Sequence, residues 1–391
     1  MSTNLQRRLL LKGLAAAGIL SQLSPMTAWA SEQALYIDGL SFLPEDLADL
    51  KASKLSAYLC DISAIEAIEQ SDGTTNYKRT YKACVQSISQ ALSRVNDNPD
   101  KLLLGKTGAD IKLAHDSGRT AVYFQIQGAD CLEKNVEDGV EKNADNELNQ
   151  VDEFYQRGLR VLQLTHHYGN KFSGGALDND GKQGLNSPLT PAGHKLVRKL
   201  NDTKMLIDVS HSSPQSALDC AKATNAPIVQ SHGAVRAIVN HARCSPDEVI
   251  KAIADTGGLF GIFMMSFWLT TDAIPTQDHY LAQLKHVAKV GGIDALAIAN
   301  DYPLRGQKNL LKLGNNNSEG VKEYLEWWHS LRERGVLGFD HEPEHVVIPQ
   351  LNHIERMERI DTALTQAKFS SSERAKIMGG NWQRVLNQVL G

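Results

Sequence analysis

The sequence predicts an α/β fold, most simply a (β/α)8 barrel, and three observations support this. Eight apolar runs of strand length follow one another along the 391 residues, segments of helical periodicity lie between most of them, and no linker interrupts the series. This alternation is typical of parallel strands joined by helices. A doubly wound open sheet is the alternative, but nothing resembling G-x-G-x-x-G follows the first run, which disfavours it.

The elements can be assigned in chain order. The expected strands are Ala34–Ile37, Leu55–Leu59, Ala121–Ile126, Arg160–Leu164, Met205–Val209, Pro227–Val229, Gly258–Ile262 and Ala295–Ala299. The expected helices are Tyr81–Arg94, Asn149–Arg157, Pro191–Asn201, Pro214–Lys222, Pro246–Thr256 and Asp278–Val290. The order Ser-Pro-Asp-Glu at 245–248 is typical of a helix start, because proline needs no N–H there.

Composition excludes two classes of function. Hydrophobic residues make up 42% of the chain, charged residues 22%, and the formal net charge is −4, a balance typical of a soluble globular protein. We find no stripe of Lys and Arg that would hold nucleic acid, and no apolar run long enough to span a membrane. The five cysteines are scattered without a C-x-x-C, so we expect core cysteines rather than a disulfide framework or a zinc finger.

The first 30 residues have the layout of an export signal. Arg7 and Arg8 precede an apolar stretch that ends in Ala28-Trp29-Ala30, and the paired arginines resemble a twin-arginine signal. A basic amphipathic helix of the mature fold is the alternative, but Pro25 and the small residues around Trp29 favour cleavage. The sequence therefore predicts periplasmic export and a single mature domain over residues 31–391.

Two histidines follow successive predicted strands, each directly after a serine. His211 comes after Met205–Val209 and His232 comes after Pro227–Val229. The site of a (β/α)8 barrel lies at the carboxyl ends of its strands, so we expect both imidazoles in one pocket. Neutral imidazole is a good zinc ligand, which predicts a metal site. The alternative is that each histidine caps a helix or bonds a loop carbonyl.

Other polar residues end strands in the same way. His166 and Asp301 could transfer a proton or polarise a carbonyl, and Arg243, in the loop after the His232 strand, could hold a carboxylate. Each has a structural alternative: Arg243 could pair with Asp247 on the surface, and Asp301 could cap the next turn. His167 is expected to be the structural member of its pair, because only one of two successive residues should face the pocket.

Several ordered segments resemble one known family. The segments are "GLRVLQLTHHYGN", "LTPAGHKLVRKLND", "MLIDVSHSS", "PIVQSHGAVRAI" and "HARCSPDEVIKAIADTGG", with "IMGGNWQRVL" near the end of the chain. They resemble the membrane (renal) dipeptidases, zinc enzymes of the amidohydrolase type, over nearly all of the mature chain. The resemblance implies a (β/α)8 barrel that holds two zinc ions bridged by a glutamate on the third strand.

The resemblance also implies roles for individual residues. His211 and His232 match the family's two later zinc ligands, and His166 matches the histidine that contacts the tetrahedral intermediate. Arg243 matches the arginine for the substrate carboxylate, and Asp301 matches the acid/base aspartate of the eighth strand. Relatives often dimerise, so a homodimer is possible, although no exposed patch in the sequence marks an interface.

Three positions depart from the family pattern. The first strand should end in Asp-Gly-His-x-Asp, but here Leu40 and Phe42 replace the two zinc ligands, and Gln127 replaces the bridging glutamate. Leucine and phenylalanine cannot bind zinc, and a glutamine carbonyl is a much weaker ligand than carboxylate. Asp61 or Asp38 could supply a missing ligand, although a turn or cap role is favoured for both.

These observations leave two hypotheses. The first is a hydrolase that cleaves dipeptides or related small peptide-like carboxylates, for which we expect one zinc ion rather than two. The second is an inactive relative that binds such molecules in the periplasm, with no tightly held metal. The retained set of His166, His211, His232, Arg243 and Asp301 favours the hydrolase.

Overall fold

The strands of the protein form a nearly closed parallel barrel. The computed structural model describes residues 34–69, 75–133, 144–180, 183–306 and 345–391, with single positions 325, 328, 329, 332, 333 and 343. Within these residues, the barrel strands are β1 (Ile37–Ser41), β2 (Ala57–Asp61), β6 (Thr120–Gln127), β7 (Leu159–Gln163), β8 (Leu206–Asp208), β9 (Ile228–Gly233), β10 (Leu259–Ile262) and β11 (Leu296–Ile298). They lie in this order, and every neighbouring pair is parallel. The predicted (β/α)8 fold is confirmed.

Three short strands lie outside this series. β5 (Leu102–Leu104) pairs in parallel with the first residues of β6. From Phe124 onward, β6 pairs with β7 instead. β3 (Glu66–Glu69) and β4 (Thr75–Lys78) form a two-stranded antiparallel sheet. Neither the sequence pattern nor the resemblance predicted them.

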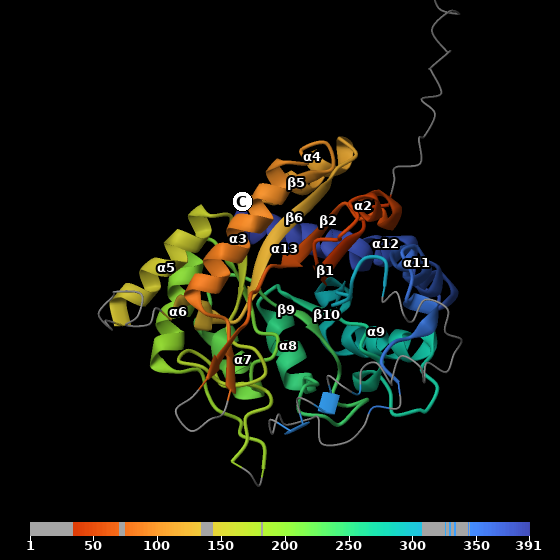
Figure 1. Cartoon of the computed structure of the whole chain (residues 1–391). Helices are drawn as coiled ribbons and strands as arrows, with labels where there is room; N and C mark the ends of the chain where they lie inside the picture. Colours follow the sequence, from red (N-terminus) through yellow and green to blue (C-terminus); the bar gives the residue numbers. More distant parts are fainter. Residues whose placement is uncertain are drawn as a thin grey trace, which may run out of the picture. The chain divides into compact units, whose positions relative to one another are not determined.

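Helices surround the strands, as Figure 1 shows. Those between the strands are α2 (Ala48–Ser53), α3 (Tyr81–Asn96), α4 (Ala109–Asp116), α5 (Ala144–Gln156), α6 (Pro191–Asp202), α7 (Pro214–Ala223), α8 (Asp247–Asp255) and α9 (Gln277–Gly291). α11 (Arg356–Gln366), α12 (Ser371–Ala375) and α13 (Asn381–Leu390) follow the barrel. Short turns are η1 (Ala129–Leu132), η3 (Ser266–Trp268), η4 (Ile293–Ala295) and η6 (Pro349–Leu351), and a π-helical turn, η7 (Lys376–Gly380), joins α12 to α13. All six predicted helices are present.

The last helix packs on the inner residues of the barrel. Trp382, Val385 and Leu386 of α13 share a fully buried cluster with inward-facing strand residues such as Ala57 and Val161. The indole N–H of Trp382 donates to the Ile298 carbonyl at 3.0 Å. A second, larger cluster fills the space between the strands and the surrounding helices. Burying apolar surface on both faces of the strands explains why they read as continuous apolar runs.

Side chains close the barrel between its first and last strands. Asp38 is fully buried, and its Oδ1 accepts from the N–H groups of Asn300 and Leu40 at 2.7 and 3.1 Å. Its Oδ2 accepts from Asn300 Nδ2 at 2.6 Å, and the Asp301 N–H donates to the Leu40 carbonyl at 2.9 Å. Burial raises the pKa of Asp38 to about 6. The role of Asp38 is therefore structural, as favoured from the sequence.

The first strand begins later than predicted. We expected a strand over Ala34–Ile37, whereas β1 runs over Ile37–Ser41 and includes the polar Asp38. The prediction stopped where the apolar run ends. The polar side chains instead lie in the strand because they bond across the closure, and the Ser41 hydroxyl donates to the Tyr302 carbonyl at 2.8 Å.

We expect Asp38→Ala to lower the free energy of unfolding by about 2–3 kcal/mol, because buried donors of Asn300 and Leu40 would lose their acceptor. Urea unfolding at pH 6 measures this difference. Asp255→Ala is the control, since Asp255 forms an exposed ion pair with Lys251, and such pairs contribute about 0–1 kcal/mol. Equal stability of the two variants would contradict the closing role of Asp38.

The structure tests some of the other sequence predictions and leaves the export signal untested. All five cysteines are buried free thiols, as expected for core cysteines. Among the described helices, none is both long and apolar enough to cross a membrane. The predicted export signal over residues 1–30 lies outside the described residues and stays a prediction. The described residues from Leu35 onward form one compact unit.

Candidate functional site

His211 and His232 meet at the carboxyl ends of two neighbouring strands. His211 follows β8, and His232 is the fifth residue of β9. Their Nε2 atoms lie 2.8 Å apart, and both side chains are buried. His211 has a φ of +64°, a left-handed conformation that few non-glycine residues adopt. The two nitrogens thus point at each other across the barrel mouth.

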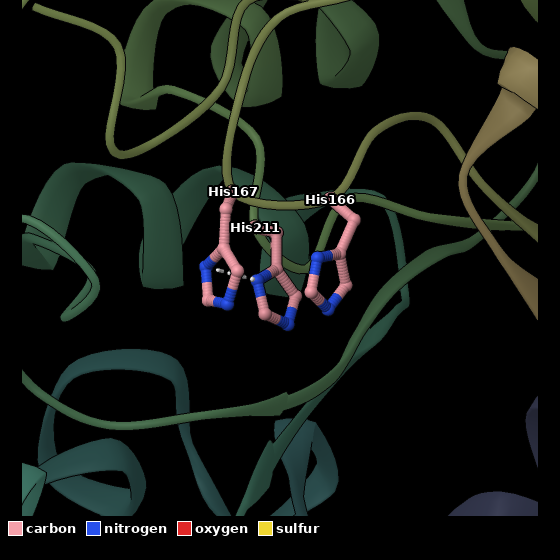
Figure 2. Close-up of side chains that lie close together, drawn as sticks. All are labelled: His166, His167 and His211. Atoms are coloured by element: carbon pink, nitrogen blue, oxygen red, sulfur yellow. Dashed lines mark hydrogen bonds between the residues drawn. The ribbon is translucent and has the colours of Figure 1, made fainter. Parts of the chain in front are cut away.

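His166 and His167 both lie against His211, as Figure 2 shows. The His166 ring stacks on His211 with centroids 4.1 Å apart and an interplanar angle of 21°. His167 Nδ1 lies 3.1 Å from His211 Nδ1. The expectation that His167 would face away from the pocket is therefore wrong. Its φ of +55° turns the chain sharply, so two successive side chains reach the same neighbour.

Only some of these nitrogens can share a metal ion. Ligand atoms of His166, His167 and His211 lie within 4.8 Å of one another. However, the lone pairs of stacked imidazoles lie in nearly parallel ring planes, so those of His166 and His211 do not converge on one point. The Nε2 atoms of His211 and His232 do converge, and their 2.8 Å separation is within about half an ångström of that expected for two nitrogens on one tetrahedral zinc.

Burial keeps the four histidines neutral. It lowers the pKa of His166, His167, His211 and His232 well below the usual value, and the positive charge of Arg243 adds to the effect. Neutral imidazole is the form that binds a metal. The donor set of His211 and His232 therefore suits a divalent cation.

Arg243 lies inside this histidine cluster. Its side chain is 2% exposed, and Nη2 donates to His211 Nε2 at 3.0 Å and to the His232 carbonyl at 3.3 Å. The guanidinium also lies over the ring of Phe263, 5.2 Å from its centroid. Burial lowers the pKa of Arg243 to about 10. The alternative surface pair with Asp247 is not formed, because Asp247 bonds His286 at 2.7 Å.

Asp301 follows β11 and lies close enough to Arg243 for their charges to interact. Its φ is +54°, a value that marks a tightly held backbone. Burial raises the pKa of Asp301 to about 8, the negative charges of Asp61 and Asp38 raise it further, and Arg243 opposes them. The structure thus brings together all five residues that the sequence singled out as site candidates.

The three departures from the family pattern remove ligands at the first and third strands. Leu40 is fully buried and apolar, and Phe42 lines a cavity of about 770 Å³ that none of the four histidines lines. Gln127 Nε2 donates to Asp61 Oδ2 at 2.7 Å, and Asp61 Oδ1 accepts from the Ser63 hydroxyl at 2.6 Å. Asp61 thus has a turn role, and neither Leu40 nor Gln127 presents a carboxylate at these strand ends.

Comparison with known proteins identifies the family. The model of the membrane dipeptidases, peptidase family M19, matches residues 25–336. The chain belongs to this family.

Individual relatives agree with this assignment. The dipeptidase verJ of Clonostachys rogersoniana is 24% identical over 295 residues, 75% of this chain and 69% of verJ. An uncharacterised dipeptidase of Schizosaccharomyces pombe is 28% identical over 186 residues, and the match spans 47% of this chain and only 43% of that relative. The crystal structure of an amidohydrolase from Pseudomonas aeruginosa superposes with a TM-score of 0.72 at 22% identity, covering 92% of this chain and 98% of that one. This M19 member therefore has the amidohydrolase-like barrel.

Sequence reasoning missed one buried residue beside the histidines. Asp208, the last residue of β8, is fully buried and accepts hydrogen bonds from both Ser210 and Ser231. These are the serines that directly precede His211 and His232. The repeated Ser-His pair is visible in the sequence, but its spacing does not show that both serines contact the same carboxylate.

Proposed function

We propose that the protein hydrolyses the amide bond of dipeptides or related small peptide-like carboxylates. The observation that carries this proposal is the convergence of His211 and His232 beside Arg243, in a chain of the membrane dipeptidase family. A metal position, a cation for a substrate carboxylate and a carboxyl group of raised pKa then lie at one barrel mouth. These are the groups that hydrolysis of a short peptide needs.

Each residue has a part in the proposed reaction. Arg243 binds the free carboxylate of the substrate, since guanidinium and carboxylate pair through two parallel hydrogen bonds. Asp301 accepts a proton from the attacking water and returns it to the leaving amine, which suits a carboxyl group with a pKa of about 8. His166, held neutral, donates its one N–H to the developing oxyanion.

His211 and His232 are the residues that would hold zinc. When bound, the ion would lower the pKa of a water molecule and polarise the substrate carbonyl. We propose one ion, because Leu40 and Gln127 offer no carboxylate where a second would need it.

A binding protein without catalysis is the second candidate. The pairing of Gln127 with Asp61 and the burial of Leu40 favour it, because both fill ligand positions with groups that do not bind zinc tightly. Such a protein would still hold a peptide-like carboxylate through Arg243. Calorimetry that detects dipeptide binding, together with no turnover in added zinc, would support this candidate over the hydrolase.

The test of the hydrolase is turnover of dipeptides and of the matching C-terminal amides by zinc-loaded protein. We expect cleavage of the free acids only, because the amides lack the charge that Arg243 binds. Arg243→Ala should raise KM for the acids by roughly 100-fold. Arg198→Ala, on the exposed face of α6, is the matched control and should change nothing. Equal cleavage of acids and amides by the parent protein would refute this role of Arg243.

A further inference from the structure

A buried polar network lies behind His232 and takes no part in the reaction proposed above. Ser231 Oγ lies 2.5 Å from Asp208 Oδ2 and 2.8 Å from His232 Nδ1. Asp208 also accepts from the Ser210 hydroxyl at 2.7 Å and from Gln125 Nε2 at 2.7 Å. The N–H groups of Ser210 and Ser231 donate to its Oδ1 at 2.8 and 3.0 Å. All of these side chains are buried.

The direction of each hydrogen bond follows from how many protons each group has. A serine hydroxyl has one proton to donate. Ser231 gives that proton to Asp208, its closest and strongest acceptor, and its oxygen must then accept from His232 Nδ1–H. A neutral imidazole protonated on Nδ1 has a bare Nε2. His232 therefore directs an Nε2 lone pair toward His211.

The same reasoning applies to His211. Arginine can only donate, so His211 Nε2 accepts from Arg243 and has no proton of its own. The His211 proton is then on Nδ1, where it faces His167 Nδ1. His211 Nε2 and His232 Nε2 thus have no proton of their own and lie 2.8 Å apart. The one lone pair of His211 Nε2 accepts from Arg243, whereas that of His232 Nε2 faces an unprotonated nitrogen and would be stabilised by a cation.

We propose that Ser231 and Asp208 are positioning residues that hold His232 protonated on Nδ1, with its Nε2 lone pair presented to the barrel mouth. The proposal rests on the function proposed above for what the lone pair then binds, but the protonation site itself is a property of the metal-free protein. Outer hydrogen-bond partners of this kind commonly fix the tautomer and orientation of metal-binding histidines.

The protonation site can be measured without metal or activity. Metal-free mature protein with ¹⁵N-labelled histidine is studied by NMR, in which a bare ring nitrogen resonates far downfield of a protonated one, and His232→Asn identifies the His232 signals. We expect bare Nε2 and protonated Nδ1. Protonated Nε2 in the parent protein would overturn the proposal, whatever the stability of any variant.

Variants then distinguish a role of Ser231 in fixing the His232 tautomer from a role in packing alone. Ser231→Ala should mix the two tautomers of His232, and Ser231→Thr, which keeps the hydroxyl, should restore the parent spectrum. Ser210→Ala is the matched control, because Ser210 donates to the same Asp208 and accepts from the His232 backbone N–H, but no hydrogen bond joins it to the His232 ring. Ser231→Ala with an unchanged tautomer, or Ser210→Ala with the same effect as Ser231→Ala, would overturn the proposal.

Zinc affinity gives a second readout, measured by competition with a chromophoric chelator. Ser231→Ala should weaken zinc binding by roughly 10- to 100-fold, whereas Ser210→Ala should change it by less than about threefold. If the parent protein binds no zinc, the proposed metal site fails and the NMR result still decides the tautomer. Parent-like zinc affinity in Ser231→Ala would count against the positioning role alone.

Discussion

Protein that carries both His211→Ala and His232→Ala should retain no zinc and should lose at least roughly 1,000-fold in kcat/KM for dipeptides. The parent should hold one zinc ion per chain. The physical reason is that these two Nε2 atoms are the converging donors at the site, while the stacked ring of His166 cannot replace them. Elemental mass spectrometry on protein purified without chelator measures the metal, and a dipeptide assay measures the turnover.

His194→Ala is the control for histidine removal in general. His194 lies on α6, outside the cluster of His166, His167 and His211, so this variant should keep the parent's zinc and rate. Two zinc ions in the parent would contradict our account of Leu40 and Gln127. A zinc content that the double replacement leaves unchanged would place the metal elsewhere in the chain.

The barrel could be predicted from the sequence because its strands are buried on both faces. That burial makes most strands continuous apolar runs, so a simple reading of hydropathy located the eight barrel strands and six of the eight described helices between them, missing α2 and α4. Hydropathy placed β1 too early in the chain. The strand contains Asp38, a buried charged residue that bonds between the first and last strands of the barrel. A buried carboxylate is compatible with a strand only when specific donors meet it, and Asn300, 262 residues away in the chain, supplies them.

The sequence predicted where the candidate site lies, but not the contacts among its residues. The rule that barrel sites lie at the carboxyl ends of strands placed His211 and His232 together. The same rule could not show that His167 adopts a positive φ and joins them, because backbone conformation at a single residue depends on the surrounding loop. Nor could it show that Arg243 bonds His211 directly, since that contact depends on how the loop after β9 folds back.

A second large effect is expected from Asp301→Asn in metal-free protein. The pKa of Asp301 is about 8 in the folded state, against 3.8 for an ordinary aspartate, so the folded protein holds a proton that the unfolded chain releases near pH 4. Stability conferred by that proton is lost as the pH rises from about 4 to about 8. Asparagine has no proton to lose, so the variant should match the parent at pH 4 and become the more stable protein at pH 8.5, by up to about 5 kcal/mol.

Chemical unfolding of both proteins across this pH range tests the prediction, and the difference between them isolates Asp301 from other titrating groups. Asp255→Asn is the matched control, because its side chain is 64% exposed and paired with Lys251 at the surface. Its effect should stay below about 1 kcal/mol at every pH. A stability difference for Asp301→Asn that does not change with pH would mean that Arg243 fully offsets the burial of the Asp301 charge. Asp301 would then be ionised at neutral pH in the metal-free protein.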